Sequence, residues 1–324
     1  MSPAADDDIA FAPLTEVARR IKAGEITSAG LTRRMLDRID RLNPTLNCYI
    51  TVCREQAIEQ AESLDRMLAA GIDLGPLHGV PVAIKDNIAT AGIRTTGGSR
   101  ILKDWIPESD APVVSRTRQA GAVILGKVTL YEFAYGGWHD DFGPETRNPW
   151  DLSRSCSASS SGPACVVAAG LAYASLGTDT GGSVRLPAAA CNLVGLKPTY
   201  GLVSRAGVLA AGYSLDHVGP FGRTVADVAA YLQVVAGPED RDPAGTRYPV
   251  PDYSVDLERG VKGMRIGVPL TQPSELIDRE MGAAFEAAVA VLEREGARIV
   301  EIDVPDHLLS RTCMWAISAS ELAE

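Results

Sequence analysis

The sequence predicts an α/β fold in which a β-sheet lies between layers of helices. Helical and extended segments alternate along most of the chain, and such alternation is typical of a sheet covered by helices. Two short apolar runs, Val80–Ile84 and Ala122–Leu125, have the composition of buried strands. A segment with helical character, Ala111–Ala120, precedes the second run.

The first seventy residues are predicted to be helical. Apolar residues recur at the spacing of one helical face over residues 14–21 and again over 31–42. We expect the second helix to end at Asn43-Pro44, because the residue before a proline disfavours the helical conformation. A third helix is expected from about Arg54 to Ala70.

The C-terminal third continues the alternation. Thr224 and Asp227 have the spacing of a capping box and predict a helix that extends to Ala236. Apolar residues over 281–292 form one helical face, and Gly296 suits the position after that helix. A strand is expected at Ile299–Ile302.

The composition, with 46% hydrophobic and 22% charged residues, is that of a folded soluble protein. The net charge of −10 and the lack of a Lys/Arg run lead us to expect no nucleic acid. The longest apolar run, Ala164–Leu176, is shorter than the roughly 20 residues that a membrane span needs.

The cysteines and histidines point to a cytoplasmic protein without a metal. Residues 1–8 are acidic and have no secretory character, so the six cysteines are expected to be free thiols. No Cys-x-x-Cys pair occurs, and the four histidines are scattered. We therefore expect neither a metal ion nor another cofactor.

Lys85 is a candidate base. It follows an apolar run and precedes Asp86, and burying an ammonium group without a partner is costly. One interpretation is that Lys85 reaches solvent or pairs with Asp86. The other is that burial lowers its pKa, so that a neutral amine can accept a proton near pH 7. The local sequence alone does not choose between them.

Ser183 is a candidate nucleophile at the end of Gly177-Thr-Asp-Thr-Gly-Gly-Ser183. One interpretation is a glycine turn with a serine helix cap. The other is a loop whose backbone N–H groups converge on an oxyanion. The run is not the Gly-x-Ser-x-Gly motif of α/β-hydrolases, so a nucleophile here needs another source of activation.

A second lysine, Lys127, lies in a segment that resembles a phosphate-binding loop only in part. Gly121 to Lys127 has the spacing of a phosphate-binding loop, but Val128 stands where Ser or Thr is required to bind Mg²⁺. The residues between Gly121 and Lys127 have the character of a hydrophobic strand. Nucleotide binding is therefore not expected.

Four segments together resemble the amidase signature family. They are Gly79-Val-Pro-Val-Ala-Ile-Lys85-Asp-Asn-Ile88, Asn148-Pro-Trp-Asp-Leu-Ser-Arg154, Gly177-Thr-Asp-Thr-Gly-Gly-Ser183 and Gly195-Leu-Lys-Pro-Thr-Tyr-Gly201. They occur in the family's order and at its spacing, and the resemblance covers nearly the whole chain. It implies the amidase signature fold, a mixed central β-sheet flanked by helices on both faces. It also implies a serine hydrolase that cleaves the C–N bond of an amide-type substrate; carbamates, ureides and esters are further possible substrate classes.

The resemblance implies a Ser-cisSer-Lys triad. Carried onto this chain, Ser183 is the nucleophile, Ser159 the bridging serine and Lys85 the terminal base. Backbone N–H groups of Thr180, Gly181, Gly182 and Ser183 are expected to form the oxyanion hole. Asp179, Arg185 and Ser160 are expected to support these groups, although an Asp179–Arg185 ion pair without catalytic effect is the alternative.

The serine-rich stretch departs from the family's pattern. Ser157, Ala158 and Ser161 stand where the family has glycines, and Pro163 follows. A cis peptide bond before Ser159 costs about 3–4 kcal/mol and depends on its surroundings. We nevertheless expect this bond to be cis.

The substrate is less well defined by the sequence. Tyr135, Trp138, Cys191 and Asp216 are candidate pocket residues, with packing as the alternative for the aromatic residues and for Cys191. The bulky segment Tyr135–Asp140 and the altered serine stretch favour a stand-alone amidase. The alternatives are the catalytic A subunit of a tRNA-dependent amidotransferase, which releases ammonia from glutamine, and a non-catalytic relative. We expect the protein to bind a small amide-type substrate and not to associate with a membrane. Whether it forms a homo-oligomer is left open by the sequence.

All 324 residues are assigned to a single amidase domain. It consists of a helical region over 1–70, a catalytic core over 75–220 and the start of a C-terminal half over 221–324. Residues 237–262, rich in Pro, Gly and Asp, are expected to be a surface connection rather than a domain boundary. Members of the family continue well beyond this length, so we expect the fold to lack its C-terminal part, with the chain stopping inside a helix that begins near His307.

Overall fold

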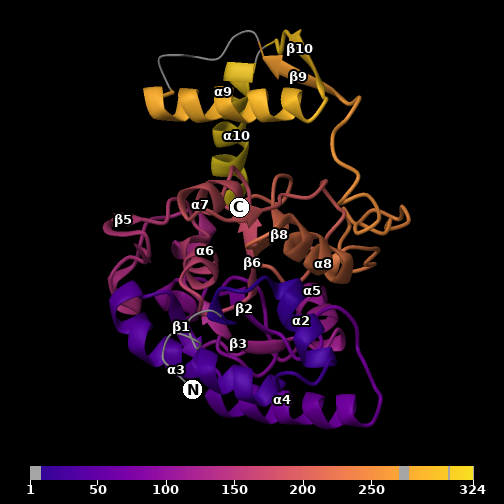
Figure 1. The fold of residues 1–324 in the computed structure, drawn as a ribbon. Coiled ribbons are helices and arrows are strands. Elements are labelled where there is room, and N and C mark those ends of the chain that lie inside the picture. Colours follow the sequence, from indigo (N-terminus) through magenta and orange to yellow (C-terminus); the bar gives the residue numbers. More distant parts are fainter. Residues whose placement is uncertain (1–8, 270–276, 306, 324) are drawn as a thin grey trace. The chain divides into compact units, whose positions relative to one another are not determined.

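The computed structural model describes residues 9–269, 277–305 and 307–323 (Figure 1). The chain forms two compact units, Met1–Tyr253 with Ser318–Glu324, and Ser254–Ile317. The division falls within 237–262, which we expected to be a connection and not a boundary. The polar segment leads from one unit into the other, and its assignment as a surface connection rather than a domain boundary stays a prediction. The assignment of all 324 residues to one domain stays a prediction.

The larger unit is built on a six-stranded mixed sheet with the strand order β1-β3-β2-β6-β8-β7. β3, β2 and β6 are parallel to one another, whereas β1, β8 and β7 are antiparallel to their neighbours. The strands are β1 (Tyr49–Val52), β2 (Pro81–Lys85), β3 (Val123–Val128), β6 (Ala174–Asp179), β7 (Val194–Gly195) and β8 (His217–Gly222). A separate antiparallel pair consists of β4 (Arg147–Asn148) and β5 (Asp151–Ser155).

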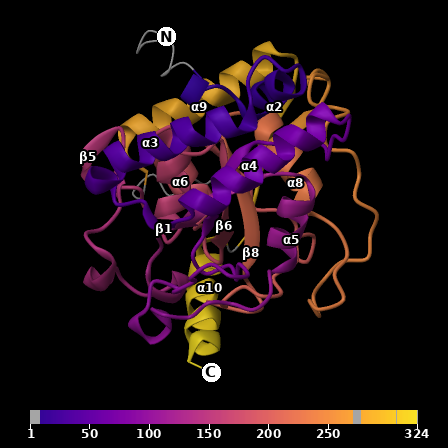
Figure 2. The same cartoon turned by 90° about the horizontal axis from the view of Figure 1, so that it is seen from below.

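Helices cover both faces of this sheet, which confirms the predicted fold class. Every residue of β2, β3 and β6 is buried, as expected for strands whose apolar runs are covered on both sides. Figure 1 shows α6 on one side of the sheet and α5 and α8 on the other, and Figure 2 shows α3 and α4 side by side. The helices of this unit are α2 (Leu14–Lys22), α3 (Ser28–Leu46), α4 (Arg54–Ala69), α5 (Pro112–Gln119), α6 (Ser161–Ala168), α7 (Arg185–Ala190) and α8 (Val225–Val235).

Helix α3 does not end at Asn43-Pro44 as predicted. Pro44 lies in the last turn, so its missing N–H removes one helical hydrogen bond and the helix continues to Leu46. Asn47 then adopts a left-handed conformation with φ 48°, and its N–H donates to the Asn43 carbonyl at 2.8 Å. The Asn43 side chain accepts hydrogen bonds from the next two backbone N–H groups, which leads the chain into β1.

The capping box at the start of α8 is confirmed. The Thr224 side chain accepts the N–H of Asp227 at 3.1 Å, and the Asp227 carboxylate accepts the N–H of Thr224 at 3.0 Å. Asp227 also accepts hydrogen bonds from the backbone and hydroxyl of Thr15 in α2. One buried carboxylate therefore both starts α8 and attaches α2 to it.

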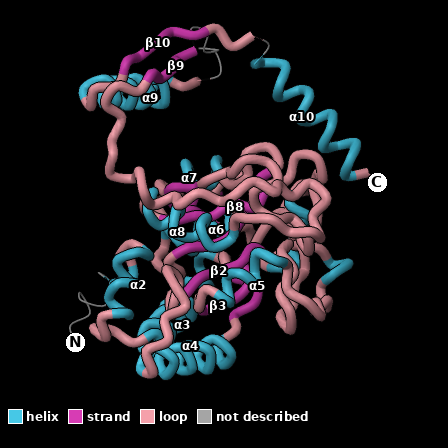
Figure 3. Tube along the Cα trace, turned by 90° about the vertical axis from the view of Figure 1, so that its right-hand side faces the viewer, coloured by secondary structure: helices cyan, strands magenta, loops and turns pink. Residues whose placement is uncertain are grey.

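The smaller unit contains a parallel pair of strands connected through a helix (Figure 3). Its elements are β9 (Arg265–Pro269), α9 (Arg279–Arg294) and β10 (Arg298–Ile302). Gly296 has φ 90° shortly after α9, where the left-handed region favours glycine, and the predicted strand lies within β10. Helix α10 (His307–Leu322) begins where the sequence predicted it. Within the described ranges, no helix has both the length and the apolar composition needed to cross a bilayer.

Candidate active site

The predicted catalytic residues come from segments that meet at one edge of the central sheet. Lys85 is the last residue of β2, and Ser183 follows the end of β6 at Asp179. The carboxyl ends of parallel strands lie at the same edge of a sheet, where α/β proteins place their sites. Ser159 and Ser160 directly precede α6, which packs on β2 and β6.

Lys85 is completely buried, and its nitrogen contacts hydroxyl groups. Nζ lies 2.9 Å from Ser159 Oγ, 2.9 Å from Ser160 Oγ and 2.7 Å from Thr178 Oγ1. It forms no ion pair in the described part of the chain, so both the solvent-exposed and the Asp86-paired interpretations are wrong. Burial lowers the pKa of the Lys85 ammonium to about 7, and the more distant carboxylates of Asp216 and Asp179 offset only part of that shift. The neutral amine is therefore well populated at neutral pH.

The two serines beside Lys85 differ in where their protons can go. Ser160 Oγ donates to the Thr178 carbonyl at 3.0 Å. Gly177 makes room for this contact, since a Cβ at that position would lie 2.9 Å from Ser160 Oγ. Ser159 Oγ has no hydrogen bond to a described residue other than Lys85. Its proton is thus free to point at the lone pair of a neutral amine, which favours Ser159 over Ser160 as the relay.

The peptide bond before Ser159 is trans, because the described residues contain no cis peptide bond. Our expectation of a cis bond is wrong for this structure. The turn is made by Ser157, which has φ 68°, and a left-handed residue costs less than the roughly 3–4 kcal/mol of a non-proline cis bond. The Tyr131 hydroxyl lies 3.3 Å from the Ser157 carbonyl and 2.9 Å from Glu145 Oε1, which is the nearer acceptor for its one proton.

The Asp179 carboxylate organises the loop that carries Ser183. It accepts the N–H groups of the residues on either side of Ser183, from Gly182 at 2.7 Å and from Val184 at 3.1 Å. Arg185 Nε and Nη2 donate to it at 3.0 and 2.9 Å, so the predicted ion pair is confirmed. Burial would raise the pKa of the Asp179 carboxyl, but Arg185 and the two N–H groups outweigh it and hold the pKa below its usual value.

These contacts narrow the candidate oxyanion hole. The Gly182 N–H is bound to Asp179, so it is not a free donor, contrary to our expectation. Gly182 itself has φ 121°, which an L-residue rarely adopts. The backbone N–H groups of Thr180, Gly181 and Ser183 have no acceptor among the described residues. They are the donors that remain for a bound anionic oxygen.

Ser183 is half-buried just before α7. Its hydroxyl makes no hydrogen bond to any residue that the structure describes. The structure therefore brings Lys85, Ser159 and Ser160 together, whereas the last link from Ser159 to Ser183 stays a prediction.

The four candidate pocket residues are engaged in internal contacts. Tyr135 packs beside a small cluster that contains Leu130 and Ala211. Trp138 Nε1 donates to a backbone carbonyl at 2.7 Å, and its ring contacts Tyr131 edge-on. Cys191 is fully buried. The Asp216 carboxylate accepts the N–H groups of residues 211 and 212 and the Thr180 hydroxyl, so it fixes the Thr180 side chain; its place in a substrate pocket stays a prediction.

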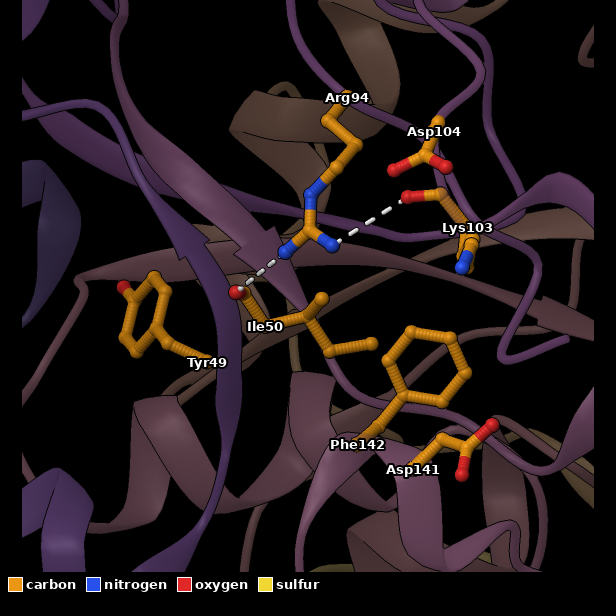
Figure 4. Close-up of a pocket in the computed structure, with 7 residues that line it drawn as sticks. All are labelled: Tyr49, Ile50, Arg94, Lys103, Asp104, Asp141 and Phe142. Atoms are coloured by element: carbon orange, nitrogen blue, oxygen red, sulfur yellow. Dashed lines mark hydrogen bonds between the residues drawn. The ribbon is translucent and has the colours of Figure 1, made fainter. Parts of the chain in front are cut away.

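A cavity of about 580 Å³ at edge strand β1 contains none of the predicted site residues (Figure 4). Its Arg94 side chain donates to the backbone carbonyls of Ile50 at 3.1 Å and Lys103 at 3.3 Å. The guanidinium is thus used in joining β1 to the loop around Lys103. No group of three or more His, Cys, Asp or Glu within the described ranges is arranged to hold a metal ion.

Sequence reasoning missed Thr178 and Asn87. Thr178 Oγ1 accepts from Lys85 Nζ and from Asn87 Nδ2, the latter at 3.1 Å. Both residues lie in the quoted motifs, Asn87 two positions after Lys85 and Thr178 within the Gly177–Ser183 run. The sequence signal that could have identified Thr178 is a hydroxyl residue near the carboxyl end of β6, the strand that pairs with β2.

The chain matches the family model Amidase over residues 30–324. It is 46% identical over 308 residues to the A subunit of glutamyl-tRNA(Gln) amidotransferase from Carboxydothermus hydrogenoformans, a match that covers 94% of this chain and 63% of that protein. It therefore spans less than two thirds of that relative's length.

Two solved structures show the same similarity. The A subunit of glutamyl-tRNA(Gln) amidotransferase from Thermotoga maritima has a TM-score of 0.82 and 38% identity, covering 91% of this chain and 63% of that one. The peptide amidase from Stenotrophomonas maltophilia has a TM-score of 0.87 and 40% identity, covering 96% of this chain and 66% of that one.

These relatives correct our expectation that nucleic acid is excluded. Two of them are subunits of an amidotransferase named for glutamyl-tRNA(Gln). The exclusion rested on a net charge of −10 and on the lack of a Lys/Arg run, and it is wrong. A net charge is summed over the whole chain and does not describe a local surface, nor what the other members of an assembly contribute.

The quoted motifs are also connected in space. Asn148 Nδ2 donates to the carbonyl of Ala190 at 2.9 Å, which attaches the Asn148–Arg154 segment to the helix that follows Ser183.

With a family model that matches most of its length and a relative at 46% identity, the chain belongs to the amidase family.

Proposed function

We propose that this chain carries the catalytic centre of an amidase-family hydrolase that cleaves an amide C–N bond through an acyl-enzyme on Ser183. The observation that carries the proposal is the buried Lys85 amine, which hydroxyl groups surround and which lies 2.9 Å from Ser159 Oγ. A neutral amine in such a pocket is a base for a serine nucleophile, as in Ser-Lys variants of the catalytic triad.

In the proposed reaction Ser183 Oγ attacks the substrate carbonyl while its proton passes to Ser159 and the Ser159 proton passes to Lys85. The carbonyl oxygen becomes negative and is bound by the backbone N–H groups of Thr180, Gly181 and Ser183, each good donor contributing about 3–4 kcal/mol. The C–N bond then breaks, and the leaving nitrogen takes the proton back from Lys85 through the same relay. Water hydrolyses the acyl-enzyme by the reverse proton path.

Closing the relay requires Ser183 Oγ to approach Ser159 Oγ to about 2.6–3.2 Å, a contact that often forms only once substrate is bound. Asp179 binds the backbone N–H groups on both sides of Ser183 and leaves the Ser183 hydroxyl free. The side chain of Ser183 can therefore rotate toward Ser159 while its backbone stays in place. The loop is thus fixed by its backbone at the position where the nucleophile must turn.

For the substrate, we propose glutamine as the amide donor, with the chain as the A subunit of a tRNA-dependent amidotransferase. The relatives named as such subunits favour this alternative over the stand-alone amidase that we preferred from the sequence. In this role, hydrolysis of glutamine through Ser183 releases ammonia, which passes to a partner protein. The charged tRNA is the substrate of the whole assembly. A stand-alone peptide amidase is the second candidate, favoured by the TM-score of 0.87 to the Stenotrophomonas enzyme.

Ammonia release tests both the reaction and the substrate. The chain is incubated with glutamine or with a C-terminally amidated peptide, each with and without the other amidotransferase subunits and charged tRNA. We expect glutamine-dependent release that increases when the partners are added, and its loss in Ser183→Ala. Ser115→Ala, which alters a half-buried serine on α5, is the matched control and should retain the activity.

The outcomes separate the two candidates. Release from the peptide amide alone, unaffected by partners, would replace the amidotransferase assignment with the stand-alone amidase. Undiminished release by Ser183→Ala from either substrate would contradict the proposed reaction itself.

A further inference from the structure

We propose that Lys127 is a positioning residue for Lys85: it binds the Asp86 carboxylate on the far side of β2 and so keeps that charge from pairing with the base. The inference rests on the proposed role of Lys85 as a proton acceptor. It assigns a purpose to the second fully buried lysine of the chain, which the proposed reaction does not use.

The strand register explains why these two residues meet. Lys127 in β3 is the register partner of Ile84 in β2, and side chains of paired residues lie on the same face of a sheet. Asp86 comes two residues after Ile84 and returns to that face, whereas Lys85 lies between them and points to the opposite one. Lys85 and Asp86 are therefore neighbours in sequence that are directed into different environments.

Neither side chain of the pair contacts Lys85, and Asp86 Oδ1 forms no hydrogen bond to a described residue, so the Lys127 ammonium is the cation that faces it. Lys127 Nζ lies 3.4 Å from Asp86 Oδ1 and donates to the Ile88 carbonyl and to Thr95 Oγ1, both at 2.7 Å. Asp86 Oδ2 accepts the backbone N–H of Thr96 at 2.8 Å and its hydroxyl at 2.5 Å. Both charged side chains are fully buried.

The pair contributes no net charge beside the base. Burial raises the pKa of the Asp86 carboxyl and lowers the pKa of the Lys127 ammonium, and the attraction between the two groups opposes both shifts. A carboxylate with an ammonium and a carboxylic acid with an amine are both neutral overall. Without Lys127, the Thr96 N–H and hydroxyl still favour a carboxylate on Asp86, and a negative charge one residue from Lys85 favours the protonated amine.

The other titratable groups around the two lysines come from several elements. Asp179 at the end of β6 and Asp216 before β8 act on Lys85 and raise its pKa. Cys53 before α4 and Asp110 before α5 act on Lys127, in addition to Asp86. None of these four residues forms an ion pair with either lysine within the described ranges, so Asp86 is the one carboxylate that Lys127 holds.

The test follows the protonation of Lys85 directly. The chain has only six lysines, so ¹³Cε-labelled lysine gives a simple NMR spectrum in which the Lys85 signal is the one that disappears in Lys85→Arg. The pKa of Lys85 is measured in the wild type, in Lys127→Met and in the charge-balanced double variant Asp86→Asn with Lys127→Met. Lys22→Met, which breaks a surface pair with Asp73, is the matched control.

We expect Lys127→Met to raise the pKa of Lys85 by about one unit or more. The double variant should return it to the wild-type value, and Lys22→Met should leave it unchanged. The acid limb of Ser183 acylation should move in parallel with the NMR titration. A folded Lys127→Met protein with an unchanged Lys85 pKa would overturn the proposal, as would an equal rise in the double variant.

A second variant covers the case in which Lys127→Met does not fold. Asp86→Asn removes the carboxylate that Lys127 holds, so the pKa of Lys85 should not rise, and a raised value would refute the role of the pair. The NMR signal reports a proton on Lys85 and not turnover. Failure of this test therefore leaves the proposed hydrolysis standing, and an inactive protein in the ammonia assay leaves the NMR result interpretable.

Discussion

The Lys85 amine and the Ser159 hydroxyl lie 2.9 Å apart, in a buried site where all three contacts to the amine are hydroxyl groups. No carboxylate of the described chain touches this nitrogen. Only the neutral amine has a lone pair that can accept the Ser159 proton, so the chemistry of the site depends on the protonation of one buried lysine.

Lys85→Met is expected to change how stability depends on pH. The lysine titrates near 10.5 when unfolded and at about 7 when folded. Between these values the unfolded chain binds a proton that the folded protein lacks, so wild-type stability rises with pH across this window. The unfavourable contribution of Lys85 is complete below pH 7 and absent above 10.5.

The free energy of unfolding of Lys85→Met minus that of the wild type should therefore fall by about 1.4 kcal/mol per pH unit from pH 7 to 10. Urea unfolding at a series of pH values measures this difference. A difference that does not vary with pH would show that Lys85 is not neutral in the folded protein.

Ser159→Ala and Ser160→Ala should separate the relay from its support. Ser159 has a proton free for Lys85, whereas the Ser160 proton is donated to the Thr178 carbonyl. We expect Ser159→Ala to slow acylation of Ser183 on the order of 100-fold or more, and Ser160→Ala to slow it by no more than about tenfold. Equal losses in the two variants would indicate that either serine can serve as the bridge.

Asp179→Asn should destabilise the Ser183 loop by about 2–3 kcal/mol, because two backbone N–H groups and Arg185 lose a buried charged acceptor. Arg185→Met is the comparison. The Arg185 side chain is 53% exposed, and the Gly182 and Val184 N–H groups still bind the buried Asp179 carboxylate without it, so Arg185→Met should cost less than Asp179→Asn. Thermal unfolding of both variants measures the contrast. If Arg185→Met were the more harmful of the two, the ion pair and not the backbone contacts would hold the loop.

Ser157→Gly should stabilise the protein by about 0.5–1 kcal/mol. Ser157 has φ 68°, a conformation that glycine adopts without the steric cost of a Cβ. Ser157→Ala keeps the Cβ and should bring no gain, which makes it the matched control. Chemical denaturation of the two variants measures the difference. A gain in both variants would point to the hydroxyl and not to the backbone conformation.

Local sequence patterns predicted the elements whose stability is local. The apolar runs of β2 and β3, the capping box at Thr224 and the glycine after α9 all depend on residues near one another in the chain. Asn43-Pro44 failed as a helix end because a proline in the last turn removes one hydrogen bond, and the left-handed Asn47 decides where the helix stops.

The sequence named the candidate site residues but predicted only part of the geometry around them. Lys85, Ser159 and Ser183 were named through resemblance to a family, and local sequence left both interpretations of Lys85 open. The structure decides between them through contacts that join distant segments: the Lys85 amine meets hydroxyl groups 74 to 93 positions further along the chain, and Asp86 pairs with Lys127 of the adjacent strand β3. The trans bond before Ser159 likewise depends on the conformation of Ser157, which residue types alone do not specify.

The central claim, that Ser183 is activated by the neutral amine of Lys85, is tested most directly by the rate at which a fluorophosphonate phosphonylates the protein at different pH values. Mass spectrometry of the peptides identifies the modified residue. We predict an adduct on Ser183 whose rate of formation increases roughly tenfold per pH unit below pH 7, levels off above it, and is abolished in Lys85→Met. An adduct on another residue, or labelling of Ser183 in Lys85→Met at the wild-type rate, would contradict the account.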